Sequence, residues 1–179
     1  MSLRLLGRRR LASGVFLHLD RQHLLDEDGG GARRDVVIHP GGVAVLPIEG
    51  DRLWLVSQRR APFGEEMLEI PAGRLEARDS DPGAAAAREL EEELGARAQE
   101  VVRLGLMAPS PGYTDEIIHL YAATGLTFGA RLPDGLEERD ATVLSLPLPE
   151  VMHRIEEGLI IDGKTQLALL LWLRRTEEK

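Results

Sequence analysis

The stretch that decides the fold runs from residue 73 to residue 96 and reads GRLEARDSDPGAAAARELEEELGA. Its second half predicts one α-helix, because alanine, leucine and glutamate have high helix propensities. Asp81 fits the N-cap position, Pro82 fits the first helical position, and Gly95 fits the left-handed residue that follows a helix. We therefore expect a helix that begins near Asp81 and ends at Gly95.

That helix carries three acids on one face. Glu89, Glu92 and Glu93 are related by i,i+3 and i,i+4 spacing, which brings side chains together on a helix. At about 100° per residue, a buried stripe is expected beside them, formed by Ala87, Leu90 and Leu94. The acids repel one another and lie near the negative end of the helix dipole. They form either a solvated acidic face or a site for a divalent cation, and helix spacing alone leaves both open.

The segment before the helix favours the cation. Glu69-Ile-Pro-Ala-Gly73 ends a strand and leads into the helix. Together they resemble the signature of the Nudix hydrolases, which is Gly, five residues, Glu, seven residues, then Arg-Glu-Leu-x-Glu-Glu-x-Gly. The matching residues are Gly73, Arg88, Glu89, Leu90, Glu92, Glu93 and Gly95. One departure is visible, because Asp79 stands where the family has Glu and Arg88 then falls one position late.

The resemblance implies a metal site and a reaction. It implies that Glu89, Glu93 and the backbone carbonyl of Ala72 hold Mg²⁺, with Glu92 as an auxiliary ligand and catalytic residue. Two or three ions are implied, with Mn²⁺ or Zn²⁺ as substitutes. The implied chemistry is hydrolysis of a nucleoside diphosphate linked to another group, in which cations neutralise charge and hold the attacking water.

Features outside the signature resemble the ADP-ribose pyrophosphatase branch of the family. Arg60 matches an arginine of that branch that binds substrate, and Arg34 is a weaker candidate for the same role. Pro111 and Glu116 lie in a stretch that resembles the substrate loop of the branch. The alternative interpretations are a solvated arginine at a sheet edge and an ordinary turn.

The resemblance also implies a general base in the acidic stretch before the last strand. It places that role on Glu137, with Glu138 as the alternative. Such a base would deprotonate a metal-bound water. A solvated acidic loop is the competing interpretation. Phe63 and Tyr113 are two candidates for stacking on a nucleotide base, and the sequence does not choose between them.

The composition supports a folded protein and limits its partners. Hydrophobic residues make up 43% and charged residues 29% of the 179 residues, as in globular domains. Thirty acids against 22 bases give a net charge of −8, which provides no general attraction for nucleic acid or anionic membrane. No cysteine is present, which excludes disulfides and thiolate metal sites. We expect a cytoplasmic protein with no signal peptide and no membrane partner.

Residues 1–38 are expected to form an N-terminal strand appendage, and residues 39–179 the hydrolase domain. Alternating strand and helix patterns indicate an α/β or α+β sandwich, and the resemblance implies an α/β/α sandwich with a mixed sheet. It also implies a homodimer in which the appendage helps pairing and shapes each site. The expected strands and final helices are Val36–Ile38, Val43–Ile48, Leu53–Ser57, Met67–Ile70, Val101–Met107, Ile117–Thr124, Thr142–Leu146, 149–157 and 164–175.

The function implied is Mg²⁺-dependent hydrolysis of ADP-ribose to AMP and ribose 5-phosphate. One alternative is the same chemistry on another nucleoside diphosphate sugar, such as GDP-mannose, or on a dinucleotide. Another is a non-catalytic nucleotide-binding sensor on the same fold, which the departure at Asp79 keeps open. An acidic Ca²⁺-binding structural protein is disfavoured, because no loop matches the Asp-x-Asp-x-Asp-Gly pattern.

Overall fold

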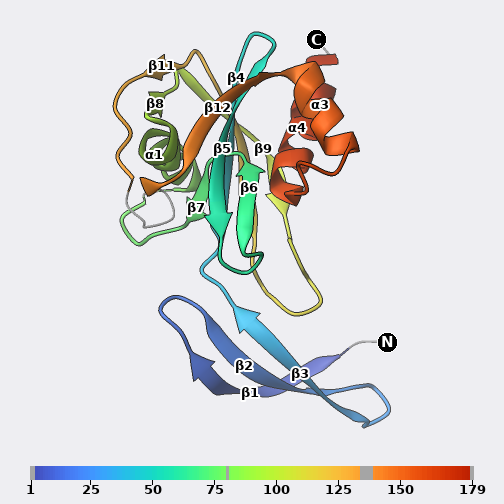
Figure 1. Cartoon of the computed structure of the whole chain (residues 1–179). Helices are drawn as coiled ribbons and strands as arrows, with labels where there is room; N and C mark the ends of the chain where they lie inside the picture. Colours follow the sequence, from blue (N-terminus) through green and yellow to red (C-terminus); the bar gives the residue numbers. More distant parts are fainter. Residues whose placement is uncertain (1–2, 80, 134–138, 178–179) are drawn as a thin grey trace. The chain divides into compact units, whose positions relative to one another are not determined.

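The computed structural model of the protein describes residues 3–79, 81–133 and 139–177. These residues form two compact units (Figure 1). The first contains the chain up to Gly41 together with Ala108–Ile117, and the second contains Gly42–Met107 and the chain from Ile118 onward. Within the described part of the chain, no helix has the length and apolar character needed to cross a membrane.

The first unit is built on a three-stranded antiparallel sheet. Its strands are β1 (Arg4–Ser13), β2 (His18–Leu25) and β3 (Gly31–Ile38), in the order β1-β2-β3. The predicted appendage of strands is therefore present. The sequence did not identify β1, because this arginine-rich strand is exposed along nearly its whole length and lacks the alternation of apolar and polar residues that marks a half-buried strand.

The segment 108–117 packs against β3. The backbone N–H of Val37 donates to the carbonyl of Tyr113 at 2.7 Å, and the carbonyl of Val37 accepts from the N–H of Asp115 at 3.2 Å. The carboxylate of Asp115 accepts from the N–H of His39 at 2.8 Å. The predicted substrate loop is thus held in the first unit by backbone pairing.

The second unit contains a mixed seven-stranded sheet with the order β12-β5-β4-β10-β9, in which β6 pairs with β5 and β7 pairs with β4. The β4–β10 pair is parallel and the other pairs are antiparallel. The short strands β8 and β11 form a separate pair. The bounds are β4 (Gly42–Glu49), β5 (Arg52–Arg60), β6 (Glu65–Glu69), β7 (Ala72–Arg74), β8 (Ala96–Arg97), β9 (Glu100–Met107), β10 (Ile118–Thr124), β11 (Thr127–Phe128) and β12 (Thr142–Pro147).

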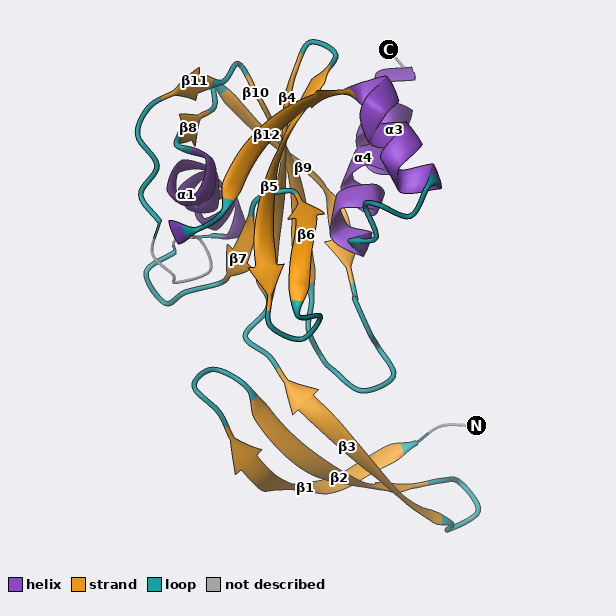
Figure 2. Cartoon of the chain, viewed as in Figure 1, coloured by secondary structure: helices purple, strands orange, loops and turns teal. Residues whose placement is uncertain are grey.

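Helices cover both faces of this sheet (Figure 2). Val43 and Val45 of β4 pack in a cluster with α1 (Pro82–Leu94). The alternate residues of β4 pack in a second cluster with α3 (Leu148–Glu156) and α4 (Gly163–Glu177). Burial on both faces explains why β4 is a continuous apolar run, and the predicted α/β/α sandwich is confirmed.

The ends of α1 lie where the sequence places them. One carboxylate oxygen of Asp81 accepts from the N–H groups of Gly83 and Ala84 at 2.7 and 3.0 Å. Gly95 has a φ of 67° and its N–H donates to the carbonyl of Glu91 at 3.0 Å. Side-chain and backbone caps therefore satisfy groups at both ends of the helix.

The predicted buried stripe of α1 is partly wrong. Leu90 and Leu94 are buried as expected, but Ala87 is exposed and Ala85 and Ala86 are buried in its place. The reason is that the buried face is centred between Glu89 and Leu90, rather than on Leu94. Consequently Ala87, about 160° from Glu89 around the helix, falls on the solvent side.

Candidate active site

Two of the three acids that share one face of α1 are buried. Glu89 and Glu93 are 5% and 3% exposed, and they lie on the same side of the helix as the core residues Leu90 and Leu94. The side chain of Glu92 is 16% exposed. Buried carboxylates are costly unless hydrogen bonds or cations compensate them, so the surroundings of this face decide what it does.

Arg88 binds this acidic face to the preceding loop. Its Nη1 donates to Glu89 Oε1 and to Glu92 Oε2, each at 2.7 Å. Its Nε and Nη2 donate to the two carboxylate oxygens of Asp79 at 3.0 and 3.1 Å. Nη2 also donates to the carbonyl of Arg74 at 3.1 Å. These five bonds match the five N–H groups that a guanidinium possesses.

The charges of this network reinforce one another. Burial opposes the charge on Arg88, but its bonds to Asp79 and Glu92 and the charge of Glu89 outweigh that effect and raise the pKa of Arg88. The hydrogen bond from Arg88, with a backbone bond from Glu76, holds the pKa of Asp79 below its ordinary value. Asp79 therefore orients Arg88, and the extra residue in the loop leaves an acid bound to that arginine.

Gly73 allows α1 to approach the sheet closely. It lies on β7, paired with Val43 of β4. A Cβ atom at this position would lie 2.0 Å from Glu89 Oε1 and 2.2 Å from its Cδ. Only a glycine leaves room for the carboxylate, which lies directly against the backbone that follows Ala72. The sequence identified Gly73 by resemblance alone, and this contact is its physical reason.

The donor groups gathered here suit a hard divalent cation, which prefers carboxylate and carbonyl oxygens. Glu89 and Glu93 lie one turn apart on the buried face of α1, and Glu89 lies against the backbone of β7. In the described segments, no three His, Asp or Glu side chains are arranged as a complete metal-binding group. Nη1 of Arg88 binds oxygens of Glu89 and Glu92 instead.

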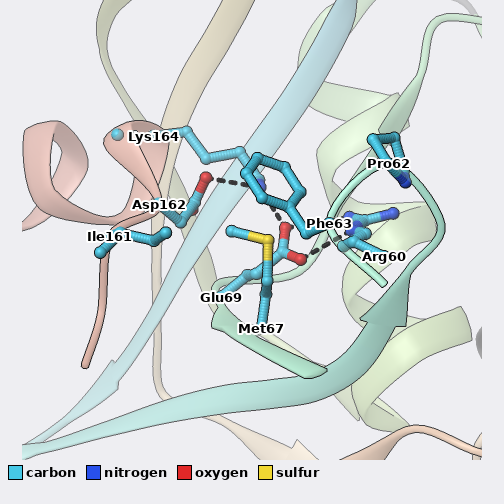
Figure 3. Close-up of a pocket in the computed structure, with 9 residues that line it drawn as sticks. Arg60, Pro62, Phe63, Met67, Glu69, Ile161, Asp162 and Lys164 are labelled. Carbon is cyan, nitrogen blue, oxygen red and sulfur yellow. Dashed lines mark hydrogen bonds and ion pairs between the residues drawn. The ribbon is translucent and has the colours of Figure 1, made fainter. Parts of the chain in front are cut away.

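A second charged cluster surrounds Glu69 at the end of β6. Glu69 is 2% exposed and accepts hydrogen bonds from Arg60 Nε and Nη2 at 2.6 and 2.9 Å. Lys164 Nζ also donates to Glu69, and it donates to Asp162 at 3.0 Å (Figure 3). Burial opposes ionisation of Glu69, but the bonds and charges of Arg60 and Lys164 hold its pKa below the ordinary value.

This cluster lies in a pocket of about 340 Å³ with apolar side chains around it (Figure 3). Phe63, Met67 and Ile161 line the pocket together with the charged groups. Phe63, one of the two stacking candidates, is largely exposed there. The other, Tyr113, is exposed in the first unit.

Two residues that line the pocket, Arg60 and Glu69, point to the face of the large sheet that α1 covers, while other lining residues come from the start of α4. Trp54 of β5 packs with the α1 cluster, and side chains alternate between faces along a strand. Arg60, six residues later, therefore shares that face. The strand register pairs Val56 with Glu69, which places Glu69 on this face as well. Arg60 thus lies on the side of the sheet where the acids of α1 gather.

The remaining predicted residues fall elsewhere. Arg34 lies on β3, and Pro111 and Glu116 lie in the segment 108–117, so all three belong to the first unit. Glu137 and Glu138 lie outside the described residues. The roles of these five residues stay predictions.

Sequence reasoning missed Glu69 and Lys164 as interacting residues. From the sequence, Glu69 is predicted to lie at the end of an ordinary strand, and Lys164 is predicted to lie at the start of a helix. The only available signal was Asp162, whose carboxylate accepts from the N–H of Thr165 at 3.0 Å in the manner of an N-cap. The sequence contained nothing that joins β6 to α4.

Comparison with known proteins agrees with this geometry. The NUDIX domain model matches residues 38–158. The crystal structure of an ADP compounds hydrolase superposes with a TM-score of 0.87 at 20% identity, covering 99% of this chain and 96% of that chain. The methanol dehydrogenase activator of Bacillus methanolicus is 40% identical over 161 residues, 89% of this chain and 86% of that protein. The ADP-ribose pyrophosphatase of Bacillus subtilis (strain 168) is 31% identical over 165 residues, 92% of this chain and 89% of that protein.

The fold, the acidic helix and the similarity to known proteins together identify this protein as a pyrophosphohydrolase. The chain belongs to the Nudix family. The predicted family, fold and enzyme class are confirmed.

Replacement of Gly73 by alanine tests the close approach of α1 to β7. The new Cβ would overlap the carboxylate of Glu89, so that side chain must move while the fold persists. Since a displacement of about 1 Å can cost about 100-fold in rate, we expect kcat to fall by at least about that factor, with little change in Tm. Gly31→Ala is the control, because a Cβ there meets nothing within 4 Å. A Gly73→Ala enzyme with full kcat contradicts this account.

Replacement of Asp79 by asparagine tests the link to Arg88. We expect a loss of about 1–2 kcal/mol in unfolding free energy at pH 7, measured by urea denaturation. The pKa of Asp79 is depressed in the folded state, so its stabilisation is complete above the ordinary value of 3.8 and disappears as the pH falls through the lower, folded-state pKa. The difference in unfolding free energy between wild type and variant must therefore become smaller as the pH falls below 3.8.

Asp35→Asn is the matched control for this experiment, because Asp35 makes a two-bonded pair with Arg21 that is exposed on the first unit. Exposed pairs contribute little, so its effect is expected to be the smaller one. Equal effects of the two substitutions, or a pH-independent effect at Asp79, would show that the Asp79–Arg88 bond does not stabilise the loop.

Proposed function

We propose that this protein hydrolyses the pyrophosphate of ADP-ribose, or of a closely related nucleoside diphosphate derivative, to give AMP and ribose 5-phosphate in a Mg²⁺-dependent reaction. The observation that carries the proposal is the pair of buried carboxylates on one face of α1, Glu89 and Glu93, of which Glu89 lies against the backbone of Gly73. The choice of substrate is supported by the ADP-ribose pyrophosphatase of Bacillus subtilis, which is 31% identical to this chain over 92% of this chain's length.

In this proposal Glu89, Glu93 and the carbonyl of Ala72 hold the metal, with Glu92 as an auxiliary ligand and catalytic residue. We propose two or three Mg²⁺ ions, for which Mn²⁺ or Zn²⁺ can substitute. When bound, the metal supplies neutralisation of phosphate charge and an acidified water. The bonds from Arg88 to Glu89 and Glu92 hold those carboxylates in alignment.

The other residues in the proposal act on substrate and water. Arg60 presents a planar fork of donors, which suits phosphate oxygens. Glu137, or alternatively Glu138, removes a proton from the attacking water. Arg34, Pro111 and Glu116 are further residues proposed to bind substrate.

We further propose a homodimer that forms through the first unit. Support comes from β1, which lies at the edge of its sheet and is exposed along nearly its whole length. An unpaired edge strand offers free backbone groups to a second strand. The side chains of Leu3, Leu5 and Leu6 are also exposed there. The absence of cysteine permits the cytoplasmic location that we propose.

A second candidate function is activation of a dehydrogenase. It is favoured by the 40% identity to the methanol dehydrogenase activator of Bacillus methanolicus. Adding the purified protein to a methanol dehydrogenase tests it directly: a faster dehydrogenase reaction supports this function, and an unchanged rate excludes it for that enzyme.

The main test measures kcat/KM for a panel of substrates in the presence of Mg²⁺ and identifies the phosphorylated products of each reaction. The panel contains ADP-ribose, GDP-mannose and a dinucleoside polyphosphate. We expect the highest kcat/KM for ADP-ribose, with AMP and ribose 5-phosphate as products. A higher kcat/KM for either other compound would overturn the choice of substrate.

The matching variant is Glu93→Gln, which keeps the shape of the side chain and removes its charge. Because metal-assisted stabilisation is worth several kcal/mol, we expect kcat to fall by about 1,000-fold or more. Glu91→Gln is the control, since Glu91 lies on the same helix but pairs with the exposed Arg97. Turnover in neither the wild type nor Glu93→Gln would indicate a nucleotide sensor instead of an enzyme.

A further inference from the structure

The buried carboxylate of Glu69 forms ion pairs with two basic side chains. Arg60 binds it with two nitrogens and Lys164 binds one of its oxygens. The side chain of Arg60 is 29% exposed, while those of Lys164 and Glu69 are 11% and 2% exposed. Arg60 therefore lies at the rim of the pocket, and Lys164 lies deeper, against the carboxylate.

This arrangement limits what Arg60 can do. The proposed function requires its guanidinium to bind a phosphate, but two of its nitrogens are bound to Glu69. If Arg60 turned away from a carboxylate with no other cation, a buried charge would be left uncompensated, and breaking a buried pair in that way is strongly unfavourable. A second cation on Glu69 removes most of that cost.

Lys164 is held in place independently of Arg60. Asp162 accepts from Lys164 Nζ at 3.0 Å and from the N–H of Thr165 at 3.0 Å. The hydroxyl of Thr165 accepts from the N–H of Ile70 at 2.9 Å, directly after Glu69. The start of α4 is thus bonded to the end of β6, so Lys164 stays beside Glu69 whatever Arg60 does.

The choice of lysine at this position is informative. Twenty of the 22 basic residues of the chain are arginines, and Lys164 and Lys179 are its only lysines. A lysine ammonium is a compact charge without a planar fork. It can neutralise Glu69 without competing for the two-oxygen geometry that Arg60 uses.

We propose that Lys164 is a positioning residue that keeps Glu69 neutralised, so that Arg60 can exchange this carboxylate for a phosphate of the substrate. The proposal rests on the proposed function and adds a residue and a step to it. Without substrate, Arg60 is bound to Glu69. With substrate, the guanidinium turns to the phosphate through the adjoining pocket of about 340 Å³, and Lys164 remains as the cation of Glu69.

The test compares Lys164→Met with wild type in steady-state kinetics on ADP-ribose. Methionine keeps the length of the side chain and removes its charge, which leaves Arg60 as the main cation of Glu69. We expect KM to rise about 10-fold while kcat changes less than about twofold, the pattern of a lost binding interaction. Lys164→Arg is expected to restore part of the KM. The control is Arg154→Met, which removes an exposed partner of Glu150 on α3 and leaves KM unchanged.

A binding measurement without metal separates this role from a purely structural one. We expect the Kd of ADP-ribose in EDTA, measured by calorimetry, to rise about 10-fold in Lys164→Met and to return to the wild-type value in Lys164→Met/Glu69→Gln, because the neutral amide releases Arg60. Glu69→Gln alone is expected to bind at least as tightly as wild type. This variant decides the matter if Lys164→Met does not fold, since weaker binding by Glu69→Gln overturns the proposal.

The outcomes distinguish this proposal from the function on which it rests. A wild type that neither binds nor hydrolyses ADP-ribose or the other members of the panel defeats the proposed function itself. A wild type that is active, with Lys164→Met showing only a lower Tm and an unchanged KM and Kd, defeats the role of Lys164 alone.

Discussion

The guanidinium of Arg88 is the interaction on which the acidic face of α1 depends. Glu89 and Glu92 would repel each other across one turn of the helix, yet one nitrogen of Arg88 binds both at 2.7 Å. The rest of the guanidinium binds Asp79 and the backbone of Arg74. A single side chain therefore bonds the loop to the helix and places a positive charge between the two acids.

The fold supplies the backbone against which these acids are held. The β4 strand is buried by helices on both faces, and β7 beside it brings Gly73 under Glu89. Strand alternation places Arg60 and Glu69 on this same face. The side chain of Arg60 consequently points to the side of the sheet on which the acids of α1 lie, which makes a metal-binding role and a phosphate-binding role compatible within this unit.

The sequence predicted those parts of the fold that local chemistry controls. Asp81, Pro82 and Gly95 define α1 because caps and proline act on adjacent backbone groups. Tertiary packing decided the rest. Ala87 was wrongly placed because the sheet, and not helix periodicity, sets which side of α1 is buried. The bond between Lys164 and Glu69 joins residues that are 95 positions apart, a separation that no local pattern reports.

The central claim is that Glu89 and Glu93 together bind a divalent cation beside Gly73, and metal binding itself tests it more directly than turnover. Electron paramagnetic resonance measures free Mn²⁺ during titration of the protein without substrate. The account predicts that wild type and Glu91→Gln take up Mn²⁺ alike, and that Glu93→Gln binds it at least about 10-fold more weakly. Equal uptake by wild type and Glu93→Gln would contradict the claim.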